Sequence, residues 1–331
     1  MSEIEVQHPF AALGPERVLD AVEALGIDCD GRLLALNSFE NRVYLVGRVD
    51  AAPLIAKFYR PGRYDDATIL DEHHFLDELA AADLPVAAPL RDAAGRSLLE
   101  VGSDPSFRVA LFPKLRGRDA DLESREHLEW LGRTIARLHQ VGQRQHFQAR
   151  APLAPGLRAR QALLDTLAGP LLPSALQSRY SATCEALIAA IEQRFAACAG
   201  VRQLRLHGDL HRGNLLWNES GPALVDFDDC VEGPAVQDLW MLLPGDAEGR
   251  ELALQALLDG YTSLRDFDHR EIALIEPLQA LRLISYGGWL SARDGDPAFP
   301  RAFPHARSPR FWDEHWWALE ELRQGALNPS L

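Results

Sequence analysis

The strongest chemical signal in the sequence is a short polar run, His207-Gly-Asp-Leu-His-Arg-Gly-Asn214. Its two glycines allow sharp backbone turns, so the run is predicted to be a loop, where chemically active side chains are often held. Asp209 and Asn214 can converge from this loop on one site. Twelve residues after Asn214, the apolar stretch Ala223-Leu-Val ends in Asp226. The pattern therefore predicts a site built from carboxylate and amide oxygens.

Such oxygens suit a magnesium-assisted transfer of a phosphoryl group. Mg²⁺ prefers hard oxygen ligands and keeps several waters, so Asn214, Asp226 and the substrate phosphates form a sufficient set. Asp209, placed off the metal, would accept the proton of an attacking hydroxyl. The isolated Asp-x4-Asn spacing is common, and His207, Asp209 and His211 are also typical of a transition-metal site in a hydrolase. The full combination favours an ATP- and Mg²⁺-dependent kinase.

A lysine upstream fits the same chemistry. Of the 34 basic side chains only Lys57 and Lys114 are lysine, and the other 32 are arginine. A lysine is a compact point charge on a thin stem, so this chain is expected to keep one where arginine fails. Lys57 lies inside the apolar run Leu54–Phe58 and is interpreted as a contact to the α- and β-phosphates of ATP. Glu72 is the predicted carboxylate partner, with Glu78 as the fallback, and Lys114 is assigned no role.

A phosphate-covering loop is expected between the first two predicted strands, at Leu36-Asn-Ser-Phe-Glu-Asn-Arg42. Such loops usually contain glycine, which lets backbone N–H groups approach a phosphate. This one has none, so Ser38 and the asparagines would supply side-chain donors instead. The alternative is a plain turn with asparagine capping.

The composition narrows the class of partner. The formal net charge of −14 argues against a general nucleic-acid or membrane-surface binder. The sequence contains no signal peptide and no run of about 18 apolar residues, and its four cysteines are scattered without a C-x-x-C pair. These features favour a cytoplasmic protein with reduced thiols. A monomer is the default expectation for its oligomeric state.

The elements that position these residues change in character along the chain. Strand-length apolar runs at 33–36, 43–49 and 54–58 precede a predicted helix from Asp65/Asp66 to Ala81, and two more strands are expected at 97–101 and 107–112. Beyond residue 118 the pattern is helical, with predicted helices at 124–141, 157–167, 178–199, 250–264, 269–292 and 309–325. Short strands at 204–206, 215–217 and 223–225 bracket the polar loop. The prediction is an α+β, two-lobed protein: an N-terminal ATP-binding lobe (1–112) formed by a small antiparallel sheet with one helix, a hinge (113–118) and a larger helical C-terminal catalytic lobe (119–331).

The residues Lys57, Glu72, His207-Gly-Asp209, Asn214 and Asp226 resemble the aminoglycoside phosphotransferase/choline kinase branch of the protein-kinase-like fold. In that branch His-Gly-Asp-x-His-x-x-Asn replaces the His-Arg-Asp loop of eukaryotic protein kinases. Within the branch, segments of the chain are most similar to a group of bacterial Ser/Thr protein kinases. These segments span nearly the whole chain, at 36–44, 57–61, 84–89, 205–209, 233–243 and 296–300.

This resemblance implies Asp209 as the proton acceptor, Asn214 and Asp226 as Mg²⁺ ligands, and Ser38 at the ATP site. It also implies a protein substrate with Ser/Thr hydroxyls and a part in a stress response. Asp226-Phe-Asp228 stands where kinases have Asp-Phe-Gly, and no Ala-Pro-Glu segment follows, which argues against an activation-loop switch of the eukaryotic type. A small-molecule hydroxyl acceptor is the main alternative, and a hydrolase or a catalytically inactive binding module are the others.

Two further expectations concern supporting residues. Asp238 is interpreted as structural, either as the N-cap of a helix or as an acceptor for backbone N–H groups of the polar loop. His139, His146 and the tryptophans near the C-terminus are expected to be packing or surface residues. The predicted helix carrying Tyr286, Trp289 and Arg293 is expected to be a core helix, with lining of an acceptor site as the alternative.

Overall fold

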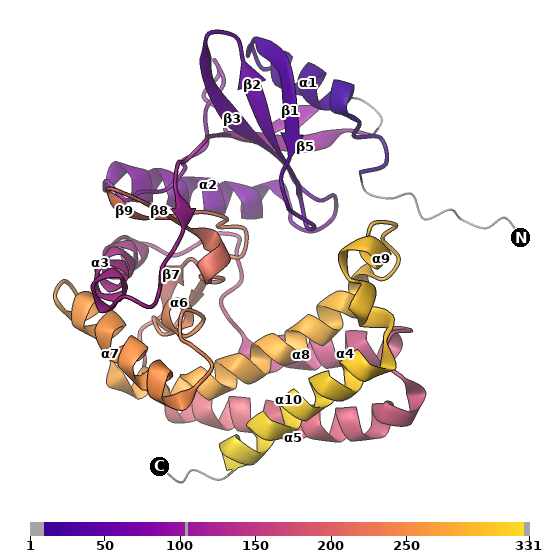
Figure 1. The fold of residues 1–331 in the computed structure, drawn as a ribbon, viewed down its shortest axis with the longest axis vertical. Helices are drawn as coiled ribbons and strands as arrows, with labels where there is room; N and C mark the ends of the chain where they lie inside the picture. Colours follow the sequence, from indigo (N-terminus) through magenta and orange to yellow (C-terminus); the bar gives the residue numbers. More distant parts are fainter. Residues whose placement is uncertain (1–9, 103–104, 328–331) are drawn as a thin grey trace, which may run out of the picture. The chain divides into compact units, whose positions relative to one another are not determined.

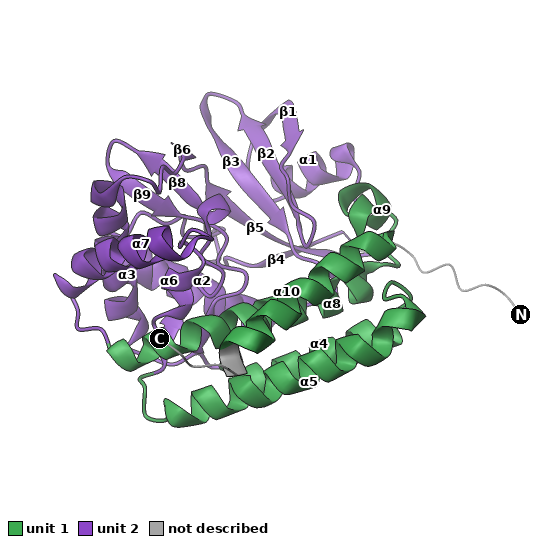
Figure 2. Ribbon diagram, turned by 60° about the horizontal axis from the view of Figure 1, so that its bottom comes forward, with its two compact units in different colours: residues 1–8, 152–202, 268–331 green, residues 9–151, 203–267 purple. Residues whose placement is uncertain are grey.

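The structure is a computed structural model that describes residues 10–102 and 105–327. The chain divides into two compact units (Figure 2). Unit 1 comprises Pro152–Arg202 and the described part of Asp268–Leu331, and unit 2 comprises the described parts of Pro9–Ala151 together with Gln203–Phe267. All six predicted site residues belong to unit 2. The predicted hinge at 113–118 lies within unit 2 and stays a prediction.

Unit 2 contains the predicted antiparallel sheet, with five strands in the order β1-β2-β3-β5-β4 (Figure 1). Each neighbouring pair is antiparallel, and β3 is the central strand. The strands are β1 (Cys29–Ala35), β2 (Arg42–Arg48), β3 (Ala51–Phe58), β4 (Leu99–Val101) and β5 (Phe107–Pro113). The predicted fold class is confirmed, as is the predicted succession along the chain of three strands, a helix and two strands. One helix that the prediction did not include, α1 (Pro15–Glu23), precedes the sheet.

The two faces of this sheet have different partners. Successive side chains of a strand point to opposite faces. On β3, Leu54 and Phe58 are fully buried in a core that α1 completes with Val22. Lys57 points to the other face and reaches Glu72 on α2 (Asp66–Ala81). The helix α2 begins where predicted, after the N-cap Asp65, whose side chain accepts the backbone N–H of Thr68.

The rest of unit 2 surrounds the polar loop with short strands and helices. The strands form two small sheets, one of β6 (Arg118–Asp119), β8 (Leu215–Asn218) and β9 (Gly221–Leu224), the other of β7 (Leu204–Leu206) and β10 (Val231–Gly233). The helices are α3 (Arg125–Gly142), α6 (Gln237–Trp240) and α7 (Ala247–Thr262). A Cβ at Gly132 would lie 2.1 Å from the backbone oxygen of Leu257, so glycine permits the close packing of α3 on α7.

Unit 1 is helical in its described part, and its long helices run beside one another (Figure 2). Its elements are α4 (Pro155–Ala168), α5 (Ser174–Ala197), the 3-10 helix η2 (His269–Leu274), α8 (Ile275–Arg293), α9 (Phe299–Ala302), the 3-10 helix η3 (Pro304–Arg307) and α10 (Pro309–Leu327). The single predicted helix at 269–292 is wrong. It divides into η2 and α8, because Pro277 lacks an N–H and suits only the first turn of a helix.

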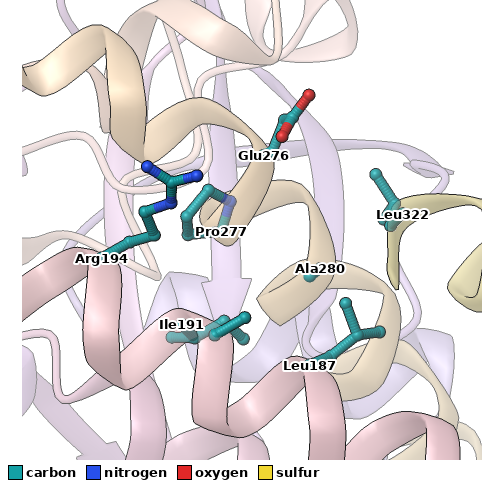
Figure 3. A pocket seen from close by; sticks show the side chains of 8 residues that line it. Leu187, Ile191, Arg194, Glu276, Pro277, Ala280 and Leu322 are labelled. Atoms are coloured by element: carbon teal, nitrogen blue, oxygen red, sulfur yellow. The ribbon is translucent and has the colours of Figure 1, made fainter. Parts of the chain in front are cut away.

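A small cavity lies among the side chains of α5, α8 and α10 (Figure 3). Its volume is about 10 Å³, which is space for about one water molecule. The side chains that line it are mostly apolar, with one arginine and one glutamate: Leu187, Ala190, Ile191, Arg194, Glu276, Pro277, Ala280 and Leu322. The cavity is therefore a packing gap in unit 1 and too small for a substrate.

Candidate active site

The polar run His207–Asn214 joins β7 to β8 and ends in the 3-10 helix η1 (Arg212–Asn214). The side-chain nitrogen of Asn214 donates a hydrogen bond of 3.0 Å to the backbone oxygen of Asp209. The structure thus brings the two ends of the predicted Asp-x4-Asn pair together. Because the amide nitrogen of Asn214 is the donor, its amide oxygen is the atom it can offer to a metal ion.

Gly208 determines the path of the loop before Asp209. Its φ of 84° lies in the left-handed region, which favours glycine. A Cβ at this position would lie 2.2 Å from the backbone oxygen of Asp229. The loop therefore passes directly against the segment that follows Asp226, and only glycine allows this approach.

Asp238 holds the backbone of the same loop in place. Its buried carboxylate accepts the backbone N–H groups of His207 and Gly208, each over 2.8 Å. It also bonds the Nε2 atom of the buried His139 over 3.2 Å, and His139 Nδ1 bonds the Tyr261 hydroxyl over 2.8 Å. The N-cap interpretation of Asp238 is wrong, because Val236 is the N-cap of α6. The alternative, an acceptor for the backbone of the loop, is confirmed.

Asp226 lies beside Asn214 because β8 and β9 form a hairpin. Leu215 pairs with Leu224, and the backbone N–H of Val225 donates to the oxygen of Asn214 over 3.1 Å. Asp226 has a φ of 63°, an uncommon conformation for a residue with a side chain. Its side chain is 57% exposed. The surrounding protein limits hydration of the carboxylate and Asp228 adds a second negative charge, so the pKa of Asp226 is raised to about 6.

Both ring nitrogens of His207 make hydrogen bonds to backbone atoms. Its Nε2 donates to the backbone oxygen of Val225 over 2.9 Å, and its Nδ1 accepts the N–H of Asp209 over 3.4 Å. The ring is fully buried, and this burial lowers its pKa. His207 is therefore a structural residue of the loop. This geometry argues against a transition-metal site formed by His207, Asp209 and His211.

Lys57 meets three carboxylates. Its Nζ lies 3.1 Å from Oε1 of Glu72 and 3.8 Å from Oδ1 of Asp226, and it forms an ion pair with Asp228. Burial on its own lowers the pKa of Lys57, but Asp228 and Glu72 outweigh it and raise the pKa well above its usual value. Glu72 is the observed partner, whereas the fallback Glu78 pairs with Arg205 over 2.6 Å. Lys57, Glu72 and Asp226 are thus brought to one place.

Comparison with known proteins gives the family. The model of the phosphotransferase enzyme family matches residues 32–275. The chain belongs to the phosphotransferase enzyme family. It is 39% identical over 325 residues to the serine/threonine protein kinase RdoA of Salmonella typhimurium (strain LT2), covering 97% of this chain and 96% of the relative. It is 40% identical over 306 residues to stress response kinase A of Escherichia coli (strain K12), covering 92% and 90% of the two chains.

A solved structure agrees with this assignment at the level of the fold. The amicoumacin kinase hAmiN, solved in complex with AMP-PNP, Ca²⁺ and Ami, has a TM-score of 0.72 with this chain. It is 19% identical, and the match covers 95% of this chain and 94% of that one. Together with the relatives named as kinases, this family membership identifies the chain as a kinase-type phosphotransferase.

Two side chains that surround Lys57 in this phosphotransferase, Asp228 and Arg63, had no role predicted from the sequence, and a third, Asn41, was predicted only as a side-chain donor over the phosphates. Asp228 is buried and pairs with Arg63 over 2.9 Å as well as with Lys57. The side chain of Asn41 donates to the same carboxylate and accepts the backbone N–H of Arg60 over 3.0 Å. The i, i+2 spacing of Asp226 and Asp228 was visible in the sequence. The contacts of Arg63 and Asn41 with Asp228, which join segments far apart in the chain, were not visible.

The loop that precedes β2 is tied to this cluster through Asn41. Ser38, which is half-buried, donates from its Oγ to the backbone oxygen of Asn41 over 3.2 Å. In the described structure this hydroxyl therefore supports its own loop. Asn41, three residues later, contacts the charged cluster directly through Asp228.

The face of the sheet that carries Lys57 continues as an apolar surface. By register, Leu34 pairs with Leu45 and Leu45 with Ile55, and Ile55 lies two residues before Lys57. Leu34 is 58% exposed, and Leu45 and Ile55 are partly exposed. A flat apolar ligand such as a nucleotide base fits this kind of surface, with its phosphates toward the lysine.

A second hollow, of about 700 Å³, lies elsewhere in unit 2. It is lined by Leu13 before α1, Arg17 of α1, Leu99 of β4 and Phe107 of β5, among other residues. These residues belong to the α1 side of the sheet, the face opposite Lys57. This hollow is separate from the site described above.

None of the helices in the described part of the chain, residues 10–102 and 105–327, has the length and apolar character needed to cross a membrane.

Proposed function

We propose that this phosphotransferase moves the γ-phosphoryl group of ATP to Ser/Thr hydroxyls of proteins. The observation that carries the proposal is the convergence of Lys57, Glu72, Asn214 and Asp226 beside Asp209 within one compact unit. Separate parts of the chain contribute these groups, and each has the chemistry that phosphoryl transfer needs. A catalytically inactive binding module would not need to keep the whole set.

The donor side of the site is proposed to bind ATP with Mg²⁺. The carboxylate of Asp226 and the amide oxygen of Asn214 are hard oxygen ligands, and the exposure of Asp226 fits an ion that also keeps water and phosphate ligands. When bound, the ion would neutralise charge on the phosphates. Lys57, already protonated between carboxylates, would place a fixed positive charge beside them. Ser38 and the loop from residue 36 to 42 are proposed to lie over the phosphates.

Asp209 is proposed as the proton acceptor on the other side of the reaction. The hydroxyl oxygen of the acceptor forms a bond to the γ-phosphorus while the bond from that phosphorus to the leaving oxygen of ADP breaks. The hydroxyl proton passes to the carboxylate of Asp209. Gly208 and Asp238 hold the backbone of Asp209 in place, so the carboxylate is oriented before the acceptor arrives.

A protein acceptor is the preferred proposal because of the full-length similarity to a relative named as a serine/threonine protein kinase. The names of the relatives also motivate a proposed role in a stress response. The second candidate is a small-molecule hydroxyl. It is favoured by the shared fold of the amicoumacin kinase.

The experiment uses purified protein with γ-labelled ATP and Mg²⁺, alone, with a generic protein substrate, and with a panel of amino alcohols and aminoglycosides. We expect label on protein, and no label with Asp209→Asn. Label on small molecules alone would replace the first candidate with the second. Loss of turnover in His211→Ala with retention in Asp226→Ala would instead support a hydrolase.

A further inference from the structure

Arg150, in the loop that follows α3, is a buried arginine outside the predicted site. Its guanidinium reaches in two directions. Toward α2, its Nε donates to the backbone oxygen of Thr68 over 3.0 Å, and one terminal nitrogen lies 3.5 Å from Oε2 of Glu72. The other terminal nitrogen donates to the backbone oxygens of Asp228 over 2.7 Å and Cys230 over 2.9 Å. One side chain thus joins α2 to the segment that follows Asp226.

Asp71, also on α2, connects this helix to the loop that carries Arg150. Its buried carboxylate oxygen Oδ2 accepts three backbone N–H groups in succession, from Gln148 over 3.0 Å, Ala149 over 2.7 Å and Arg150 over 3.0 Å. Charged acceptors of this kind make strong hydrogen bonds. Asp71 fixes the backbone of the loop, and its neighbour Glu72 contacts the arginine side chain from that loop.

Glu72 consequently has a different partner on each carboxylate oxygen. Oε1 faces Lys57 and Oε2 faces Arg150. The contacts run without interruption from Lys57 through Glu72 and Arg150 to the backbone of Asp228, two residues beyond Asp226. All of these side chains except that of Asp226 are buried.

We propose that Arg150 and Asp71 are positioning residues, which hold Glu72, and through it Lys57, at a fixed place relative to Asp226. The effect of these two residues on catalysis rests on the proposed function. The contacts of Arg150 and Asp71 with α2, which we call the clamp, do not depend on that function.

Lysine cannot replace arginine in this clamp. The planar fork of arginine serves Thr68, Glu72 and two carbonyl oxygens at once, whereas a lysine ammonium is a single point on a flexible stem. Arg150→Lys therefore keeps the charge and loses the bridge. Asp71→Asn keeps the shape of the side chain but weakens its three backbone contacts, and it tests the clamp independently of the arginine.

The first measurement compares Lys57 with Lys114, the two lysines of the sequence, and does not score the lysine that Arg150→Lys adds, which lies on a separate peptide. Acylation by a small activated ester is followed at Lys57 and Lys114 by peptide mass spectrometry. We expect the ratio of the Lys57 rate to the Lys114 rate to rise at least about threefold in Arg150→Lys and in Asp71→Asn, because a released Glu72 exposes Lys57. Asp77→Asn is the matched control, since Asp77 lies on the same helix and pairs with Arg91. Because Lys114 is already exposed, a general loss of structure would also raise this ratio, so each variant must first show the same urea unfolding midpoint as Asp77→Asn.

The second measurement is a double-mutant cycle on phosphoryl transfer. We expect Arg150→Lys to lower kcat/KM for ATP by about tenfold, and to add no further loss in a Glu72→Gln background. An unchanged lysine ratio in both folded variants, or full additivity with Glu72→Gln, would overturn the assignment. If Arg150→Lys does not fold, Asp71→Asn decides by the same two readouts. If the lysine ratio rises in the two variants but the wild-type protein has no kinase activity, the proposed function is wrong and the clamp remains.

Discussion

Two regions of unit 2 lie on opposite faces of the five-stranded sheet and differ in the side chains they bury. Between the sheet and α1, Val22, Leu54 and Phe58 form an apolar core. On the other face, Lys57 and Glu72 are buried almost as completely, but they are charged. The same β-strand, β3, supplies alternate residues to both regions.

The difference separates the residues that stabilise the fold from those that serve the reaction. Burial of apolar area stabilises the folded state by roughly 25 cal/mol per Å². Buried ion pairs contribute little net stability, because desolvation of the charges offsets their attraction. The charged cluster is therefore explained by what it does to phosphates, and substitutions on the two faces should have different signatures.

The largest effect is expected for Asp209→Asn in the charged region. An amide cannot accept the hydroxyl proton, so kcat should fall about 10³-fold, equivalent to about 4 kcal/mol, while ATP still binds. Initial rates and calorimetric titration with a non-hydrolysable ATP analogue measure the two quantities. A kcat within tenfold of wild type would mean that another group accepts the proton.

Phe58→Ala, on the apolar face, should show the reverse pattern. It leaves a cavity between α1 and the sheet and should lower the free energy of unfolding by about 3 kcal/mol. The protein that remains folded should keep its KM for ATP, because Phe58 points away from Lys57. Urea unfolding and steady-state kinetics make the comparison. A raised KM with unchanged stability would contradict the separation of the two faces.

The sequence predicted the site where the partners follow from short-range patterns. Asp209, Asn214 and Asp226 were identified because one loop and the next strand end contain them. Lys57 was identified because lysine is rare in this chain, and Glu72 because it falls on the helix that follows. Asp228, Arg63 and Arg150 were not assigned, because their contacts join segments far apart in the chain and depend on packing that spacing does not encode.

The elements were predicted wherever hydrophobic periodicity was strong. The five strands follow from short apolar runs of strand length, and α2 from its opening at Asp65/Asp66 and its apolar face. The helix α1 was missed because it is only nine residues long, and its buried residues Val18, Ala21 and Val22 span little more than one turn. The change from η2 to α8, between Leu274 and Ile275, was missed because periodicity continues across it, although Pro277 suits only the first turn of a helix and so indicates a start nearby.

Lys57→Arg tests whether the charged face needs lysine or only a positive charge. The wider guanidinium does not fit the position that one ammonium occupies between Glu72 and Asp228, so kcat/KM should fall about 100-fold. Stability should change little, since the charge remains. Lys114→Arg is the control and should leave both quantities unchanged. Full activity of Lys57→Arg would refute the interpretation of the lysine bias.

The smallest effect is expected for His73, a buried residue of α2, whose titration should make the stability of the protein depend on pH. Its ring bonds the Tyr59 hydroxyl over 2.8 Å and the Ser97 hydroxyl over 2.9 Å. Burial, followed by the charge of Lys57, lowers the pKa of His73 to about 3. An unfolded histidine has a pKa of about 6.5, so the stability that neutral His73 contributes is complete above that pH and is lost as the pH falls toward 3.

His73→Gln removes this titration. The difference in unfolding free energy between wild type and the variant should shrink by about 2 kcal/mol when the pH is lowered from 7.5 to 5. Urea unfolding at the two pH values measures it. His74→Gln, at an exposed position on the same helix, should leave the pH dependence of wild type intact. A His73→Gln difference that stays constant between the two pH values would show that His73 is not held neutral, and the charged face would then tolerate one more positive charge beside Lys57.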